Sequence, residues 1–101
     1  MRAHRGTRRT SVYRDRVVPA QRFARIVATA AELRLDCLAS LASPGRHRLD
    51  KRQARRLAVE AELVRRSAAV LELDDDLAAI ADVARWCARA SGPAWLTVGR
   101  P

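Results

Sequence analysis

The sequence predicts an all-α protein: a small antiparallel bundle of three helices with a disordered basic N-terminal arm and a short C-terminal tail. Apolar residues recur at helical spacing over most of residues 19–90, and the first apolar stripe ends at a Ser-Pro-Gly sequence. The first 18 residues are rich in arginine and hold little apolar surface. With 101 residues, the chain has room for one packed domain, which we place at residues 19–101.

The arm is predicted over residues 1–18. It contains Gly6, several hydroxyl residues and closely spaced arginines, and Val12 and Tyr13 are among its few apolar side chains. Repulsion between the arginines favours an extended chain, which could become ordered along a phosphate backbone. The alternative is a solvated tail that only keeps the protein soluble.

The first helix is predicted over residues 19–42. Pro19 suits the first position of a helix, because its missing N–H is not needed there. The apolar stripe that follows consists of Phe23, Ile26, Ala30, Leu33, Cys37 and Leu41. Ser43, Pro44 and Gly45 then end the helix.

The second helix, residues 50–72, has the clearest start. Asp50 is the expected N-cap, and Gln53 lies three residues later, where its amide can reach back to the cap. The chain from Gly45 to Leu49 is then a polar connector. One narrow seam of this helix alternates alanine with larger aliphatic residues: Ala54, Leu57, Ala61, Val64, Ala68 and Leu71.

A second apolar group on this helix, Val59, Leu63 and Val70, falls on roughly the opposite side from the seam. The helix is therefore expected to contact two partners. Two i,i+4 pairs, Arg56 with Glu60 and Glu62 with Arg66, would support it weakly.

The third helix is predicted over residues 74–90, because the apolar register changes near residues 72–75. Asp74 would be its N-cap, with two more aspartates in the first turn. The junction contains no Gly or Pro, so one long kinked helix is the alternative. Gly92 and Pro93 end the helix, and Trp95 is expected to fold back against the bundle.

The charge is the strongest indication of function. The formal net charge is +9, and the isoelectric point is near 11.4. The excess of bases is concentrated in residues 1–25 and 45–66. Such a protein should bind polyanions, most plausibly DNA or RNA, through phosphates and with little sequence preference. The expected binding residues are Arg2, Arg5, Arg8, Arg9, Arg14, Arg16, Arg46, Arg48, Lys51, Arg52, Arg55 and Arg56.

Nothing in the sequence indicates an enzyme, a cofactor or a metal centre. The potential zinc ligands Cys37, Cys87, His4 and His47 are scattered along the chain, and no glycine-rich phosphate loop is present. Two cysteines are too few for a disulfide scaffold, so both are expected to be core residues of a cytoplasmic protein. No apolar run has the roughly 20 residues needed to cross a bilayer.

A second function from a different class remains open. The alanine seam and the extra Val59, Leu63 and Val70 group also suit a protein-interaction or assembly module, which completes its core with a second copy or with a partner. In that case the arginines keep the protein soluble or bind an acidic protein.

Overall fold

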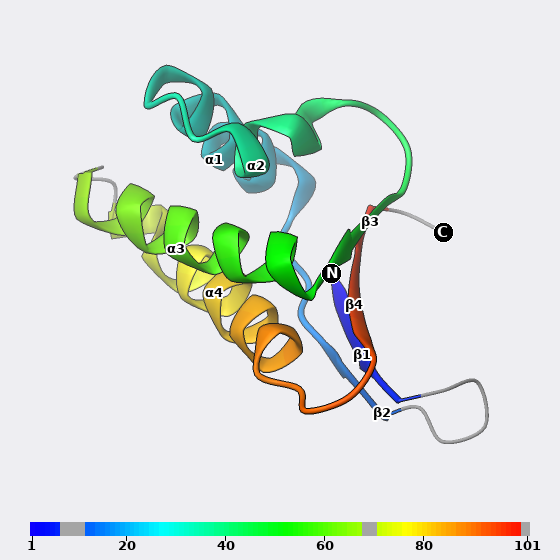
Figure 1. Cartoon of the computed structure of the whole chain (residues 1–101). Coiled ribbons are helices and arrows are strands. Elements are labelled where there is room, and N and C mark those ends of the chain that lie inside the picture. Colours follow the sequence, from blue (N-terminus) through cyan, green and yellow to red (C-terminus); the bar gives the residue numbers. More distant parts are fainter. Residues whose placement is uncertain (7–11, 68–70, 100–101) are drawn as a thin grey trace.

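The computed structural model describes residues 1–6, 12–67 and 71–99, and it shows an α+β fold where the sequence predicted a three-helix bundle (Figure 1). The strands are β1 (Arg2–Arg5), β2 (Val12–Asp15), β3 (His47–Asp50) and β4 (Ala94–Val98). The helices are α1 (Ala20–Glu32), α2 (Asp36–Ala39), α3 (Lys51–Ser67) and α4 (Asp74–Ala88), and 3-10 turns lie at Ser40–Ala42 and Leu71–Leu73.

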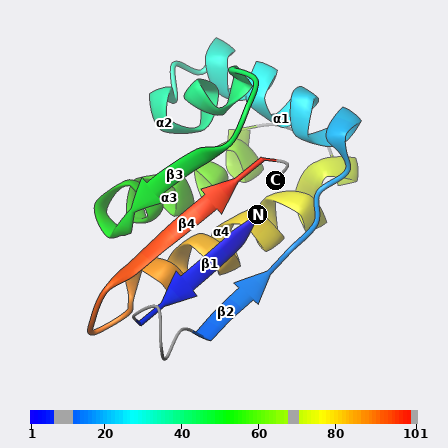
Figure 2. The ribbon, with the colours of Figure 1, turned by 90° about the vertical axis from the view of Figure 1, so that its right-hand side faces the viewer.

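The two ends of the chain are strands of one sheet, so the predicted disordered arm and short tail are wrong. The strand order is β2-β1-β4-β3, and all neighbours are antiparallel. β1 lies beside β4, with Ala3 opposite Leu96 (Figure 2). The connector before the second predicted helix is also a strand, because Leu49 pairs with Leu96 from the other side. All four strands therefore lie in segments that were expected to lack regular structure: the arm, the connector and the tail.

α3 and α4 form a helical layer that covers one face of the sheet (Figures 1 and 2). Ala3, Leu49 and Leu96 face this layer and are buried. The predicted seam is confirmed over the described part of α3, since Ala54, Leu57, Ala61 and Val64 are all buried. The side chains of Ala68 and Leu71, which complete the predicted seam, lie outside the described residues.

The predicted start of α3 is confirmed by its capping box. Asp50 Oδ1 accepts a hydrogen bond from Gln53 N at 2.8 Å, and Gln53 Oε1 accepts one from Asp50 N at 2.9 Å. Asp50 is also the last residue of β3. The capping box therefore turns the chain directly from the sheet into the helical layer.

The predicted break between the second and third helices is confirmed, because α3 ends at Ser67 and α4 begins at Asp74. Asp74 is not the N-cap. That position is Leu73, and the Asp74 carboxylate instead accepts a hydrogen bond from Arg65 at 3.0 Å. The three aspartates occupy the first turn of α4, where their charge complements the helix dipole.

The predicted first helix ends ten residues early, at Glu32. Arg34 adopts a left-handed backbone conformation, with φ of 58°. The Leu35 N–H then bonds to Ala30 O, and the Arg34 N–H bonds to Ala31 O. This is a Schellman ending, which usually has glycine at the left-handed position. Because arginine stands there, the helix end could not be predicted from the sequence.

The short helix α2 is held by a buried carboxylate of α3. Glu60 is only 4% exposed, and its two oxygens accept hydrogen bonds from the backbone N–H groups of Cys37, at 3.2 Å, and Leu38, at 2.8 Å. Arg56 donates a further bond to the same carboxylate at 3.1 Å, as its predicted pairing with Glu60 requires. Glu60 thus satisfies the N-terminus of α2 and ties that helix to the helical layer.

Candidate nucleic-acid interface

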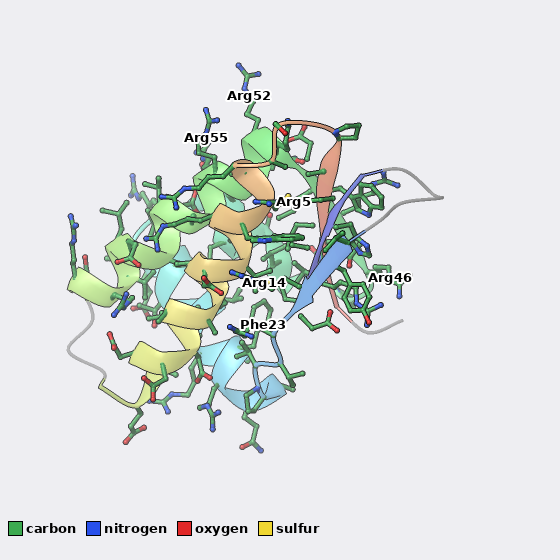
Figure 3. The ribbon with its side chains drawn as sticks, turned by 90° about the horizontal axis from the view of Figure 1, so that it is seen from below. Arg5, Arg14, Phe23, Arg46, Arg52 and Arg55 are labelled. Carbon is green, nitrogen blue, oxygen red and sulfur yellow. The ribbon has the colours of Figure 1, made fainter. Side chains whose placement is uncertain are left out.

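Three of the cationic residues predicted to bind nucleic acid instead hold the fold together. The Arg5 guanidinium lies 4.0 Å from the Trp86 ring centroid and donates to the Trp86 carbonyl oxygen. Arg14 pairs with Asp82 at 3.2 Å, beside the same ring. Both side chains run from the strands towards α4 (Figure 3). Lys51 Nζ donates to two carbonyl oxygens in the loop before β4.

Three further predicted residues form ion pairs. Arg2 Nε lies 2.6 Å from Asp15, Arg16 lies 3.4 Å from Asp82, and Arg56 pairs with Glu60 as described above. Their charges are largely compensated within the protein. Such partly exposed pairs still remain open to exchange with a phosphate, because each contributes only about 0–1 kcal/mol.

The remaining predicted residues do not form one site. Arg46, Arg48, Arg52 and Arg55 have no carboxylate partner among the described residues. Arg52 and Arg55 extend outward from α3, whereas Arg46 lies on the far side of the sheet (Figure 3). Arg8 and Arg9 lie outside the described residues. The structure therefore divides the predicted basic surface into a part on the sheet and a part on α3.

The sheet face turned away from the helices carries the residues that sequence analysis missed. Strand register places His4 opposite both Tyr13 and Trp95, so three rings lie in one row across β2, β1 and β4. Figure 2 shows the strands in front of the helical layer on this side. We call this surface the outer sheet face, and its side chains are Arg2, His4, Tyr13, Asp15, Arg48, Asp50, Trp95 and Thr97.

Arginines cover the rings of this row. The His4 and Trp95 rings are stacked, with centroids 4.8 Å apart and planes 7° from parallel. Arg48 lies over the Trp95 ring at 4.9 Å, and Arg2 lies over the Tyr13 ring at 4.4 Å. Two of the three rings therefore carry a guanidinium group, and the third is stacked on Trp95.

A hollow of about 480 Å³ lies at one end of the outer sheet face. Its lining includes Arg2, His4, Arg16 and Arg46, together with the Asp15 carboxylate. Three arginines and one carboxylate thus line a hollow next to the row of rings.

The environment of His4 disfavours its protonated form. Partial burial lowers the pKa of the imidazole from its ordinary value near 6.5, and the positive charges of Arg2 and Arg48 lower it further, whereas Asp15 acts in the opposite direction. The neutral form of the His4 ring therefore predominates at pH 7.

Lowering the pH from 7 to 5 is expected to destabilise the protein through His4. The folded state binds this proton less tightly than the unfolded state, so the stability contribution is complete above pH 6.5 and is lost as the pH falls through the folded pKa. The carboxylates of Asp15 and Asp74, whose pKa values are lowered, affect the stability only at lower pH. An NMR titration of the His4 ring should give a pKa below 6.5, and His4→Gln should flatten the dependence of urea stability on pH between 5 and 6.5. A ring that titrates at 6.5 or above would contradict this assignment.

The sequence did contain a faint signal for the outer sheet face. A strand is recognised in a sequence by apolar residues that alternate with polar ones. Residues 2–5 and 12–15 hold too few apolar residues to show this alternation clearly, and arginines dominate both segments. Trp95 was expected to pack on helices, but it lies half-buried on the outer sheet face of β4, turned away from the helical layer.

The other chemistry considered from the sequence finds no geometric support. Among the described residues, no three His, Cys, Asp or Glu side chains lie close enough together to hold a metal ion. Burial raises the pKa of the free thiols of Cys37 and Cys87. Within the same residues, no helix is long and apolar enough to cross a membrane. Comparisons with protein-family models, curated proteins and solved structures gave no match.

Proposed function

We propose that this protein binds single-stranded nucleic acid, RNA or DNA, across its outer sheet face. The observation that carries the proposal is the row of Tyr13, His4 and Trp95 on three adjacent strands. Proteins that bind single strands commonly stack unpaired bases on exposed aromatic side chains, and a base pair in a duplex cannot offer its face in this way. The row therefore favours single strands over duplexes.

The arginines over the rings are weak enough to be displaced. A guanidinium on an exposed ring contributes about 0.5–1 kcal/mol, whereas a base stacked on an aromatic side chain contributes about 1–3 kcal/mol. A base can therefore replace Arg48 on Trp95 and Arg2 on Tyr13. Each displaced guanidinium is then available to a neighbouring phosphate, which gives it a stronger, charge-assisted contact.

The electrostatic contribution is expected to be moderate despite the net charge of +9. Asp15 already pairs with Arg2, and Asp50 lies at the end of the row beside Trp95. About three phosphates can be neutralised, chiefly by Arg16, Arg46 and Arg48. The logarithm of affinity should then fall with the logarithm of salt concentration with a slope of about −2.

Replacing two of the three rings tests this proposal. Fluorescence anisotropy with labelled 12-nucleotide pyrimidine strands, RNA and DNA, should show about tenfold weaker binding for each of Tyr13→Leu and Trp95→Leu, because a stacking contact is lost without a change in charge. A duplex of the same length should bind more weakly than the strands. Val12→Thr, in the same strand as Tyr13, is the matched control and should bind normally.

A second pair of variants locates the site. Arg52→Gln and Arg55→Gln on α3 should leave single-strand affinity nearly unchanged, because these side chains extend away from the outer sheet face (Figure 3). Unchanged affinity in the double variant Tyr13→Leu with Trp95→Leu, combined with a large loss in the α3 variants, would overturn the proposal and assign binding to the helical arginines.

A further inference from the structure

We propose that a groove between α3 and α4 binds an acidic amphipathic helix of a partner protein. The groove measures about 630 Å³, and its apolar floor consists of Ala58, Val59, Leu63 and Ala88. Val59 is 55% exposed and Leu63 is 40% exposed, although both lie on a helix whose other face is fully packed. This apolar strip is covered by nothing in the described chain.

Four arginines line the same groove. Arg55 and Arg66 belong to α3, Arg85 belongs to α4, and Arg89 is the C-cap of α4. The single lining acid, Glu62, is already shared between Arg85, at 2.9 Å, and Arg65, at 3.0 Å. Burial opposes ionisation of Glu62, but the bonds from these two arginines outweigh it and lower its pKa. The groove therefore offers apolar surface inside a positive rim.

This combination selects one kind of occupant. A second copy of the chain would bring the same arginines to the contact, and the like charges would repel. A nucleic-acid backbone would match the arginines but would leave Val59 and Leu63 without an apolar partner. A helix with leucines on one face and glutamates beside them satisfies both features, as amphipathic helices do in other hydrophobic grooves.

The dimensions define the partner further. The twelve residues from Arg55 to Arg66 span roughly 17 Å at a rise of 1.5 Å per residue, which is about three helical turns. A partner helix of this length would present apolar residues at positions i, i+4 and i+7 to the floor. Carboxylates beside that stripe would reach Arg55 and Arg66 on α3 and Arg89 at the end of α4. The groove lies on α3 and α4 alone, so the inference is independent of the outer sheet face.

A synthetic peptide tests the groove in the full chain. The probe is a fluorescein-labelled 14-residue helical peptide with leucines at i, i+4 and i+7 and glutamates on the flanks, and its control has the same composition in scrambled order. The ordered peptide should bind at least tenfold more tightly. Val59→Gln with Leu63→Gln should weaken binding about tenfold, as should Arg55→Glu with Arg89→Glu. Val17→Gln, at a valine that is 88% exposed elsewhere, is the matched control and should have no effect.

Three results would overturn the proposal. Equal binding of the ordered and scrambled peptides would reduce the groove to a nonspecific basic surface. Competition by a DNA duplex, with no effect of the Val59 and Leu63 variants, would make it a polyanion site. A dimer in sedimentation equilibrium that Val59→Gln with Leu63→Gln dissociates would make the occupant a second copy. Binding of single-stranded nucleic acid should persist in all groove variants. If the peptide does not bind the groove, the proposed function of the outer sheet face is therefore unaffected.

Discussion

A chain that begins at Pro19 is expected to lose cooperative folding. The deleted segment contains β1, which lies between β2 and β4, and Ala3, which is fully buried against the helical layer. Its loss would leave β4 paired only with β3 and would remove the Arg5 and Arg14 contacts with Trp86. A domain of this size has only about 5–15 kcal/mol of stability, and half of its sheet cannot be removed within that margin.

Circular dichroism can measure this effect directly. The full chain should show a cooperative thermal transition, and the truncated chain should show none, together with a loss of the near-ultraviolet signal of Trp86 and Trp95. The matched control is the full chain with Arg2→Gln and Arg16→Gln, which lowers the positive charge of this segment but keeps both strands. It should unfold cooperatively. A truncated chain that unfolds within a few degrees of the full chain would show that the segment is an accessory arm after all.

Deletion of residues 1–18 is an unsuitable test of nucleic-acid binding. If residues 1–18 were an independent arm, deleting them would isolate its contribution to binding. β1 and β2 instead supply His4 and Tyr13 to the outer sheet face. Deleting residues 1–18 would therefore unfold the protein and at the same time remove two of the three aromatic rings from the proposed site. Point substitutions on an intact sheet are therefore the informative experiments.

Features encoded by neighbouring residues could be predicted from the sequence. The capping box joins Asp50 to Gln53 over three positions, and the seam of α3 repeats every three or four residues. Both follow from helix geometry alone, and both are confirmed. The break before α4 was visible for the same reason, since a change in apolar register is a local signal.

The sheet could not be predicted in this way, because its pairing is not local. β1 has one apolar residue, Ala3, and its partner Leu96 lies near the other end of the chain. A strand with so little hydrophobic character forms because a neighbouring ladder and the helical layer stabilise it, and not through its own propensity. The positive charge of Arg5 and Arg14 predicted contacts with nucleic acid. Both side chains instead contact Trp86, which is distant in the sequence, so their role could not be predicted from local charge.

Among single substitutions, Glu60→Ala is expected to be strongly destabilising, by about 3 kcal/mol. Removal of the carboxylate leaves the N–H groups of Cys37 and Leu38 without their acceptor, and the Leu38 N–H is buried. An unsatisfied buried group costs about 1–3 kcal/mol, and the loss also creates a cavity beside α2. Thermal unfolding should shift down by about 15 °C for a domain of this size.

Two companion variants separate the acceptor role of Glu60 from its charge. Glu60→Gln keeps one acceptor oxygen and should cost about half as much as Glu60→Ala. Arg56→Ala removes the ion pair but leaves both backbone bonds, and it should cost under about 1 kcal/mol, since Arg56 is 64% exposed. Urea denaturation gives the three free energies, and hydrogen exchange at Cys37 and Leu38 should accelerate most in Glu60→Ala. If Arg56→Ala and Glu60→Ala proved equally destabilising, the ion pair and not the cap of α2 would be the source of stability. The order expected here follows from burial: the carboxylate and the Leu38 N–H that it serves are out of contact with water, whereas the guanidinium is largely solvated.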